Sequence, residues 1–390
     1  MTTNTADTAR SAPARGHSLP AARRTAGWLL ACVMCLAVMG LIAGVSTAAP
    51  GEAWSKLSLH CLHLGMGLAA FLACFSLPVD AVRKAIPGLI VLTVILLVGM
   101  LVTDSIGERS KGAERWLSIG GFRFQPSVML QCLWPVVLSS WAARDPLRLR
   151  QPRELWRMMF GFAVLMVPVL LQPDLGSVLI LLGVSGMTLF FAGAPLRFLR
   201  LLVPVSVAAL LIAIFLFDHV DSRLKEFLHG SSYQIERAEE AFAAGGLGGR
   251  GPGEGLLKHG YVPEGETDFI LALVAEEWGL GGTVLLWGLF VALTVFGVRL
   301  AQQADTRYGA ILMASATLMI AVQAALNMAV VTGAVPPKGL PLPFVSRGGS
   351  SILALSALLG LALKAALEAR RSRKCRPGVV EWTASNVLAS

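Results

Sequence analysis

Long apolar segments alternate with short polar ones along most of this chain. A helix needs about 20 apolar residues to cross the hydrocarbon core of a membrane, and segments of roughly that length recur. Backbone groups must be hydrogen-bonded within such a segment, and no alternating strand pattern is visible, so we predict helices as the spanning elements. Their predicted ranges are 26–48, 57–77, 85–103, 128–142, 158–172, 175–192, 201–218, 269–298, 308–331 and 350–368.

The composition excludes an ordinary soluble domain. Hydrophobic residues make up 55% of the 390 positions and charged residues 15%, and the mean hydropathy is +0.67. We therefore expect an all-α integral membrane protein, a polytopic helical bundle with about ten transmembrane helices. A large extracytoplasmic loop, 219–268, precedes the eighth of them.

The basic residues predict the orientation. Most of the 33 Lys and Arg residues fall on one side if the N-terminus is cytoplasmic, so both termini are assigned to the cytoplasm. The net charge of +9 then reflects topology and an anionic inner leaflet, and no nucleic-acid partner is needed. Residues 1–25 and 369–390 are predicted to be disordered cytoplasmic tails around a membrane domain, 26–368. The apolar run from Ala26 exceeds the core of a signal peptide, which favours a retained first helix.

The most unusual polar stretch is acidic and glycine-rich, Ala243–Gly279. It contains Asp268 immediately before a predicted spanning helix. A carboxylate at the rim of a membrane domain is expensive unless it has a function, which makes Asp268 a candidate for chemistry. The alternative is that Asp268 caps the following helix.

Three other outer segments are dense in Gly, Pro and charge. They are Gly112–Leu117 with the following Gln125–Ser127, Gln172–Ser177, and Gly339–Ser351. All are assigned to the same side of the membrane as Asp268, so a composite site there is geometrically possible.

With these motifs in this order, the sequence closely resembles the SEDS family, the peptidoglycan glycosyltransferases of the FtsW and RodA type. The resemblance covers about 26–368. The segment Pro337–Pro343 is more similar to division members of the FtsW type than to elongation members. Val128, Gln131, Pro337 and Arg347 depart from the residues that are usual in the family.

The resemblance implies polymerisation of lipid II at the outer face of the cytoplasmic membrane, with undecaprenyl pyrophosphate as leaving group. Asp268 matches the family's catalytic Asp and would act as general base. A diphosphate leaving group needs cations, for which Arg115, Lys258, Lys338 and Arg347 are the outer candidates. The full predicted substrate-binding set is Arg115, Trp116, Gln172, Asp174, Lys258, Glu264, Glu276, Lys338, Ser346, Arg347 and Ser350.

Several of these residues have structural alternatives. Asp174 is suited to cap the sixth predicted helix, and Glu276 to make a polar contact between helices. The run Ser346–Ser351 can be a flexible start of a helix, although its Gly pair suits close approach to a phosphate. His60 and His63 fit a packed or interfacial role better than a metal site. Gly246–Gly251 matches a dinucleotide fingerprint, but no strand precedes it, which favours a tight loop.

The expected partners also follow from the resemblance. They are lipid II and undecaprenyl-pyrophosphate-linked glycan, a class B penicillin-binding transpeptidase, and other division-complex proteins. The use of a divalent cation stays open, because the acidic outer residues show no recognisable ligand spacing. A RodA-type elongation polymerase, a lipid-precursor flippase or transporter, and a non-catalytic division scaffold are the competing functions.

Overall fold

The computed structural model describes residues 19–46, 53–102, 108–110, 113–119, 122–172, 174–196, 218–230, 232–256, 265 and 267–368, with isolated positions between 200 and 217. The predicted tail 369–390, residues 1–18 and most of the predicted span 201–218 lie outside them. The elements are α1 Leu19–Ser46, α2 Ala53–Ser76, α3 Val79–Val102, β1 Glu108–Ser110, β2 Ala113–Ile119, β3 Phe122–Phe124, α4 Pro126–Arg144, η1 Pro146–Arg150, α5 Pro152–Leu171, α6 Leu175–Phe191, α8 Asp218–Leu228, α9 Tyr233–Gly245, α10 Ile270–Gln303, α11 Arg307–Val331 and α12 Gly349–Leu367.

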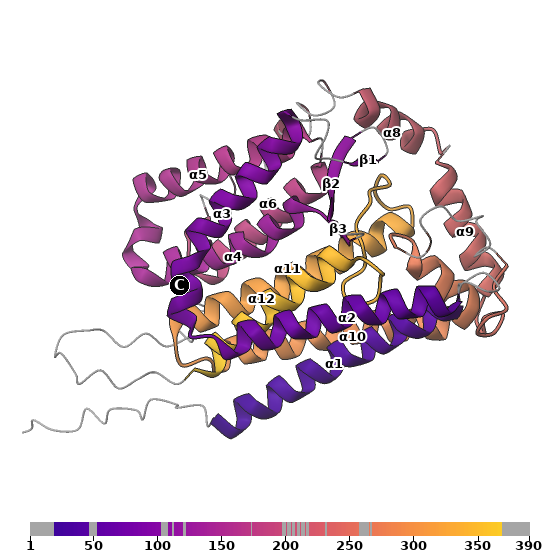
Figure 1. Cartoon of the computed structure of the whole chain (residues 1–390), viewed down its shortest axis with the longest axis horizontal. Coiled ribbons are helices and arrows are strands. Elements are labelled where there is room, and N and C mark those ends of the chain that lie inside the picture. The colour runs from indigo at the N-terminus through magenta and orange to yellow at the C-terminus, as the bar shows by residue number, and fades with distance from the viewer. Residues whose placement is uncertain are drawn as a thin grey trace, which may run out of the picture.

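The described helices form an elongated bundle (Figure 1). Among them, seven are long and apolar enough to cross a membrane: α1, α2, α3, α5, α10, α11 and α12. The apolar helix α6 is shorter, and α4 packs beside α3, α6 and α11. The predicted polytopic helical membrane fold is confirmed. The first helix begins at Leu19, earlier than predicted, so part of the predicted disordered tail is helical.

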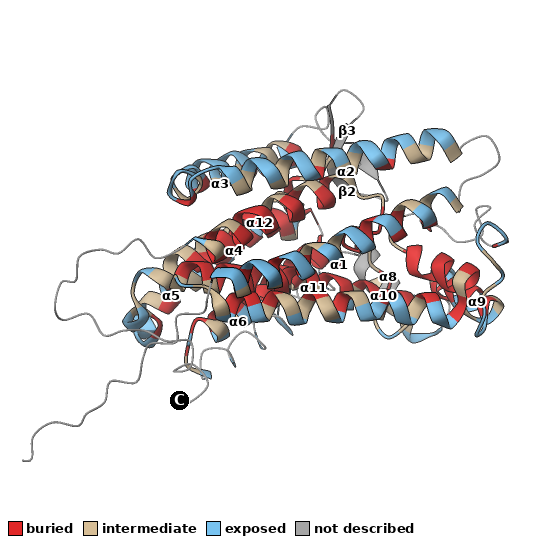
Figure 2. Ribbon diagram, turned by 90° about the horizontal axis from the view of Figure 1, so that it is seen from below, coloured by how far each residue is buried: buried red, intermediate tan, exposed pale blue. Residues whose placement is uncertain are grey.

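Burial is distributed as a membrane bundle requires. Figure 2 shows buried residues concentrated on the central helices α4, α11 and α12, while α1, α2 and α3 carry broad exposed faces. Those faces are apolar, with Met34, Leu62 and Val91 among the exposed side chains, as expected of surfaces that face lipid. Inside, small polar side chains link helices: Thr188 donates to Ser315 at 2.9 Å.

Glycines let α2 and α12 pack closely. A Cβ added at Gly360 would lie 2.4 Å from the carbonyl oxygen of Phe71, and one at Gly67 would lie 2.7 Å from Ile352 Cγ2. Gly67 of α2 lies near Ile352 at the start of α12, and Phe75, further along α2, lies near Lys364 toward the end of α12. The two helices therefore run parallel. Leu19 and Leu367 therefore lie at the same end of the bundle (Figure 1).

Replacing Gly360 by Ala is expected to destabilise the protein by about 1–3 kcal/mol, because the clash is with backbone rather than with a flexible side chain. Gly65→Ala on α2 is the matched control, since nothing lies within 4 Å of its added Cβ. Thermal unfolding in detergent measures both. Equal midpoints for the two variants would contradict this packing.

The end of the bundle opposite Leu19 and Leu367 carries structure that the sequence did not predict. A three-stranded antiparallel sheet, β1-β2-β3, pairs Arg109 with Glu114 and Leu117 with Phe124. The absence of an alternating pattern hid these strands, because short strands outside the membrane need no apolar face. The predicted loop 219–268 likewise contains two helices, α8 and α9.

Candidate functional site

Asp268 lies in the turn just before α10, and its side chain is half-buried. The N-cap position belongs to Phe269, and no side chain caps the helix there. The capping alternative for Asp268 is therefore wrong. A half-buried carboxylate beside a helix start is reachable by substrate, yet lies where the positive end of the helix dipole favours its charged form.

Two side chains from other segments fix the main chain around Asp268. Asn327 of α11 donates from Nδ2 to the carbonyl oxygens of Asp268, at 2.7 Å, and of Leu340, at 2.6 Å. Ser346 donates its hydroxyl to the carbonyl oxygen of Thr267 and accepts from the Leu342 N–H at 2.8 Å. The turn that carries Asp268 is thus tied to the loop between α11 and α12.

That loop approaches Asp268 directly. A Cβ added at Gly339 would lie 2.9 Å from Asp268 Oδ2, so the backbone beside Lys338 passes next to the carboxylate. Phe344, which is buried, has a φ of 63°, a strained value for a residue other than glycine. Gln323 of α11 donates to the carbonyl of Pro341 at 2.9 Å and helps to hold this shape. The loop thus brings Gly339, next to Lys338, and Ser346, next to Arg347, against the turn that carries Asp268.

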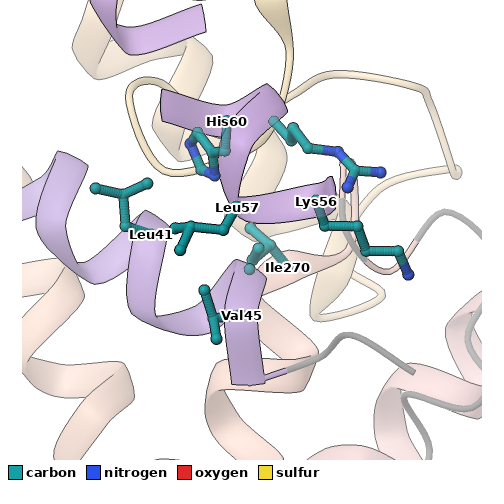
Figure 3. Close-up of a pocket in the computed structure, with 8 residues that line it drawn as sticks. Leu41, Val45, Lys56, Leu57, His60 and Ile270 are labelled. Atoms are coloured by element: carbon teal, nitrogen blue, oxygen red, sulfur yellow. The ribbon is translucent and has the colours of Figure 1, made fainter. Parts of the chain in front are cut away.

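Arg347 faces a pocket between α1, α2 and the start of α10. The pocket is lined by Leu41, Val45, Leu57, Ile270, Lys56, His60 and Arg347, together with Gly44. Figure 3 shows side chains from these elements converging on it. Lys56 was not predicted for the site, although it is the one Asp, Glu, Lys or Arg residue of the apolar helix α2, a signal that is visible in the sequence.

Asp174 and Gln172 belong to a separate, structural network. Asp174 caps α6 by accepting from the Ser177 N–H at 3.2 Å, and its Oδ2 also accepts from Ser127 at 2.8 Å and Gln125 at 3.1 Å. Gln172 donates to the carbonyl of Leu97 at 2.9 Å. The capping alternative for Asp174 is confirmed, and the carboxylate is occupied within the fold. Ser350, at the start of α12, joins this network by accepting from the Gln125 N–H at 3.2 Å.

Glu276 also has a structural environment. It is fully buried, accepts from the Leu256 N–H at 2.7 Å and lies 3.9 Å from Arg250 Nε. The adjoining glycine loop packs against α10: a Cβ at Gly249, whose φ is +76°, would lie 2.2 Å from the carbonyl oxygen of Glu277. The tight-loop interpretation of the dinucleotide-like motif is confirmed, because an L side chain would neither fit there nor readily adopt that φ.

Of the remaining predicted residues, only Trp116 has a side chain among the described ones. Trp116 is half-buried in β2, and the backbone of Arg115 lies in the same strand while its side chain is outside the described part. Lys258 and Glu264 fall outside the described residues. Within the described part of the chain, no group of three or more His, Cys, Asp or Glu side chains is arranged to hold a metal ion.

Comparison with known proteins identifies the relatives of this chain. A family model described as "Cell cycle protein", for FtsW, RodA and SpoVE, matches residues 26–371. The chain belongs to the FtsW/RodA/SpoVE family. The resemblance drawn from its sequence motifs is confirmed.

Individual members of the FtsW/RodA/SpoVE family match over most of the chain. A probable peptidoglycan glycosyltransferase FtsW of Caulobacter vibrioides is 37% identical over 267 residues, which cover 68% of each protein. Peptidoglycan glycosyltransferase MrdB of Escherichia coli K12 is 32% identical over 345 residues, covering 85% of this chain and 91% of MrdB. Rod shape determining protein RodA of Thermus thermophilus has a TM-score of 0.64 at 26% identity, covering 87% of this chain and 95% of that one.

A further structure, of a peptidoglycan synthase complex that coordinates polymerization and crosslinking, has a TM-score of 0.69 at 27% identity. It covers 87% of this chain and 96% of that chain.

The surroundings of Gln131 and Arg347 explain two of the departures from the family pattern. Gln131 is buried and donates to Ser177 at 2.7 Å, so it extends the Asp174 network between α4 and α6. Arg347 adds a cation to the pocket beside Ile270. Val128 is half-buried on α4 and packs against the core, and nothing in the structure explains a special role for it.

Asn327 and Gln323 are further residues that the sequence did not predict for the site. Both are buried on α11, one helical turn apart, in an otherwise apolar helix. Polar side chains in a spanning segment are a recognised signal of function or of helix–helix hydrogen bonding. The two amides are visible in the sequence, but their partners are not, because three of the four acceptors are main-chain carbonyls and the fourth is the hydroxyl of Ser351.

Proposed function

We propose that this chain is a peptidoglycan glycosyltransferase that polymerises lipid II into glycan strands, with Asp268 as general base. One observation carries the proposal: a half-buried carboxylate is fixed at its main chain by Asn327 and Ser346, next to a loop that contains Lys338 and Arg347. The family membership supplies the substrate class.

The reaction requires a base because a sugar hydroxyl is a weak nucleophile. The 4-hydroxyl of the acceptor's GlcNAc attacks the anomeric carbon of the donor's MurNAc, and Asp268 accepts the hydroxyl proton. The new glycosidic C–O bond forms as the bond from the anomeric carbon to the diphosphate oxygen breaks, with inversion. The electron pair leaves on undecaprenyl pyrophosphate.

Charge develops on the leaving diphosphate, and cations held in place before the reaction stabilise it. Lys338 and Arg347 support this role by their position in the loop that contacts the Asp268 turn. Arg115 and Lys258 stay predicted contributors. In contrast, Gln172, Asp174, Glu276 and Ser350 support the site indirectly, because their polar groups serve the fold around it.

Cell division is the favoured context. The segment Pro337–Pro343 is similar to FtsW-type members, and relatives named FtsW match at up to 37% identity, although MrdB matches at 32%. A class B penicillin-binding transpeptidase is the proposed partner, supported by the solved peptidoglycan synthase complex that this chain resembles. Other division proteins would join that assembly.

The site is proposed to face outward, with both termini in the cytoplasm. A cysteine in place of Glu254, an exposed residue of the glycine loop, should react in intact cells with a thiol reagent that cannot cross the membrane. Gln151→Cys, also exposed but at the other end of the bundle, should react only after permeabilisation. The reverse pattern would invert the topology and place Asp268 on the wrong side for this function.

Transport of a lipid-linked precursor is the competing activity. The polar groups of the candidate site gather at one end of the bundle, whereas alternating access requires them near the midplane. Polymerisation of lipid II by the purified chain in detergent tests the proposal, because detergent removes the two compartments that a transporter needs. Glycan formation there supports a polymerase, and movement of labelled lipid II across proteoliposomes without glycan formation would favour a transporter.

A further inference from the structure

We propose that the pocket formed by Lys56, His60 and Arg347 binds the diphosphate head of a polyprenyl lipid. The assignment of the lipid rests on the proposed function, whereas the assignment of a phosphoryl group rests on the pocket itself. Neither Lys56 nor His60 was among the residues predicted for the site.

His60 is the observation that points to a ligand. Its side chain is 2% exposed, it lines the pocket, and neither ring nitrogen has a hydrogen-bond partner among the described residues. Figure 3 shows the imidazole beside Leu57, opposite Leu41 and Val45 of α1. A buried polar group without a partner costs stability, so a packed histidine that serves only the fold is a poor explanation.

The surroundings make room for this imidazole. Gly44 of α1 lies opposite it, and a Cβ added there would lie 3.3 Å from His60 Nδ1. One turn further along α2, His63 contacts Gly349 at the start of α12, where an added Cβ would lie 2.8 Å from Nε2. Both histidines are thus accommodated by glycines on neighbouring elements.

The donor set specifies an anion with several oxygens. Lys56 is one helical turn before His60 on the same face of α2, and Arg347 reaches the pocket from the loop before α12. Lys and Arg side chains only donate hydrogen bonds, and a guanidinium forks onto phosphate oxygens. An imidazole N–H adds a further donor, so α2 and the loop before α12 both contribute donors to the lining of this pocket.

The apolar wall specifies a lipid rather than a free ion. Leu41, Val45 and Leu57 border the cationic groups, and α1 and α2 continue from there as lipid-facing helices. A phosphoryl head at this position therefore leaves its hydrocarbon chain in the membrane. Ile270, two residues after Asp268, forms another wall, so the pocket adjoins the proposed catalytic turn.

The test measures binding to the purified chain in nanodiscs, with farnesyl diphosphate and inorganic pyrophosphate as probes and empty nanodiscs as blank. Wild type should bind farnesyl diphosphate saturably and at least tenfold more tightly than pyrophosphate. Lys56→Gln, Arg347→Gln and His60→Leu should each weaken that binding at least tenfold. Arg24→Gln, which removes an exposed cation at the other end of α1, should leave it unchanged.

His60→Leu provides a second readout. Because neither ring nitrogen has a hydrogen-bond partner among the described residues, the variant should unfold at the same temperature as wild type or higher, while binding is lost. A lower unfolding temperature with unchanged affinity would make His60 a structural residue and overturn the proposal. Unchanged affinity in both Lys56→Gln and Arg347→Gln, which alter half-buried side chains, would overturn it as well.

The outcomes separate this inference from the proposed function. Asp268→Asn should bind farnesyl diphosphate within about twofold of wild type although it makes no glycan. If wild type polymerises lipid II but the pocket variants bind normally, only the pocket assignment fails. Equal affinity for pyrophosphate and farnesyl diphosphate would overturn the assignment to a lipid.

Discussion

Asp268→Asn is expected to lower the rate of lipid II polymerisation by about a hundred- to ten-thousand-fold, the contribution typical of a general base. The amide has nearly the shape of the carboxylate but cannot accept the proton of the attacking hydroxyl. The main-chain contacts of Asp268, made by Asn327 to its carbonyl, do not involve the substituted group. Glycan formation by purified protein, followed by gel separation of labelled strands, measures the loss.

Two controls keep that result interpretable. The thermal unfolding midpoint and helix content of Asp268→Asn should match wild type, which excludes a folding defect. Glu254→Gln changes an exposed carboxylate in the glycine loop and should retain full activity. A folded Asp268→Asn protein that made glycan at the wild-type rate would show that another group is the base.

Asn327→Leu is the second substitution with a large expected effect. It leaves the carbonyls of Asp268 and Leu340 without their donor and frees the turn from the loop. A displacement of about 1 Å at a reacting group costs roughly a hundredfold in rate, so turnover should fall by that order. Loss of hydrogen bonds to two buried or half-buried carbonyls should also lower stability by about 1–3 kcal/mol.

If Asn327 positions Asp268, the effect of Asn327→Leu on the rate depends on the presence of the Asp268 carboxylate. A purely structural effect of Asn327 does not depend on it. In an Asp268→Asn background, Asn327→Leu should reduce the residual rate little further, because the base it positions is already lost. The same stability loss should remain in both backgrounds. Independent, multiplicative effects on the rate would contradict positioning, as would a wild-type rate in folded Asn327→Leu.

The sequence predicted the fold well where one physical rule dominates. Apolar length defines spanning helices, so the predicted bounds of α11 and α12 agree with the structure to within one residue, and those of α2, α3 and α10 to within six. The strands β1 to β3 and the helices α8 and α9 were missed, because outside lipid neither apolar length nor a buried face constrains the pattern. The early start of α1 at Leu19 has the same cause, since its first turns include Arg23 and Arg24.

The site was predicted less evenly. The cost of a carboxylate at the rim of a membrane domain selected Asp268, which the structure places beside the loop that carries Lys338, and its catalytic role stays a prediction. The same argument also selected Asp174 and Glu276, whose carboxylates accept hydrogen bonds within the fold. Sequence position cannot separate these cases, because the partners of Asp174 and Glu276 come from segments that only folding brings near.

Asn327 shows the converse limit. Its amide was visible as a polar group in an apolar helix, but its acceptors are carbonyls of Asp268 and Leu340, which carry no residue-specific signal. His60 was visible too, and its pairing with Lys56 follows from helical spacing. Its lack of a hydrogen-bond partner within the described structure emerges only once α1 is packed against α2.

The most direct test of the central claim is polymerisation of purified lipid II by this chain, alone and together with a co-purified class B penicillin-binding transpeptidase. Penicillin in the reaction blocks crosslinking, so linear strands accumulate and can be resolved by length. The account predicts a ladder of glycan strands that requires Asp268, with release of undecaprenyl pyrophosphate in step with each sugar–sugar bond formed. A folded chain that yields no glycan and no undecaprenyl pyrophosphate, with or without the transpeptidase, would contradict it.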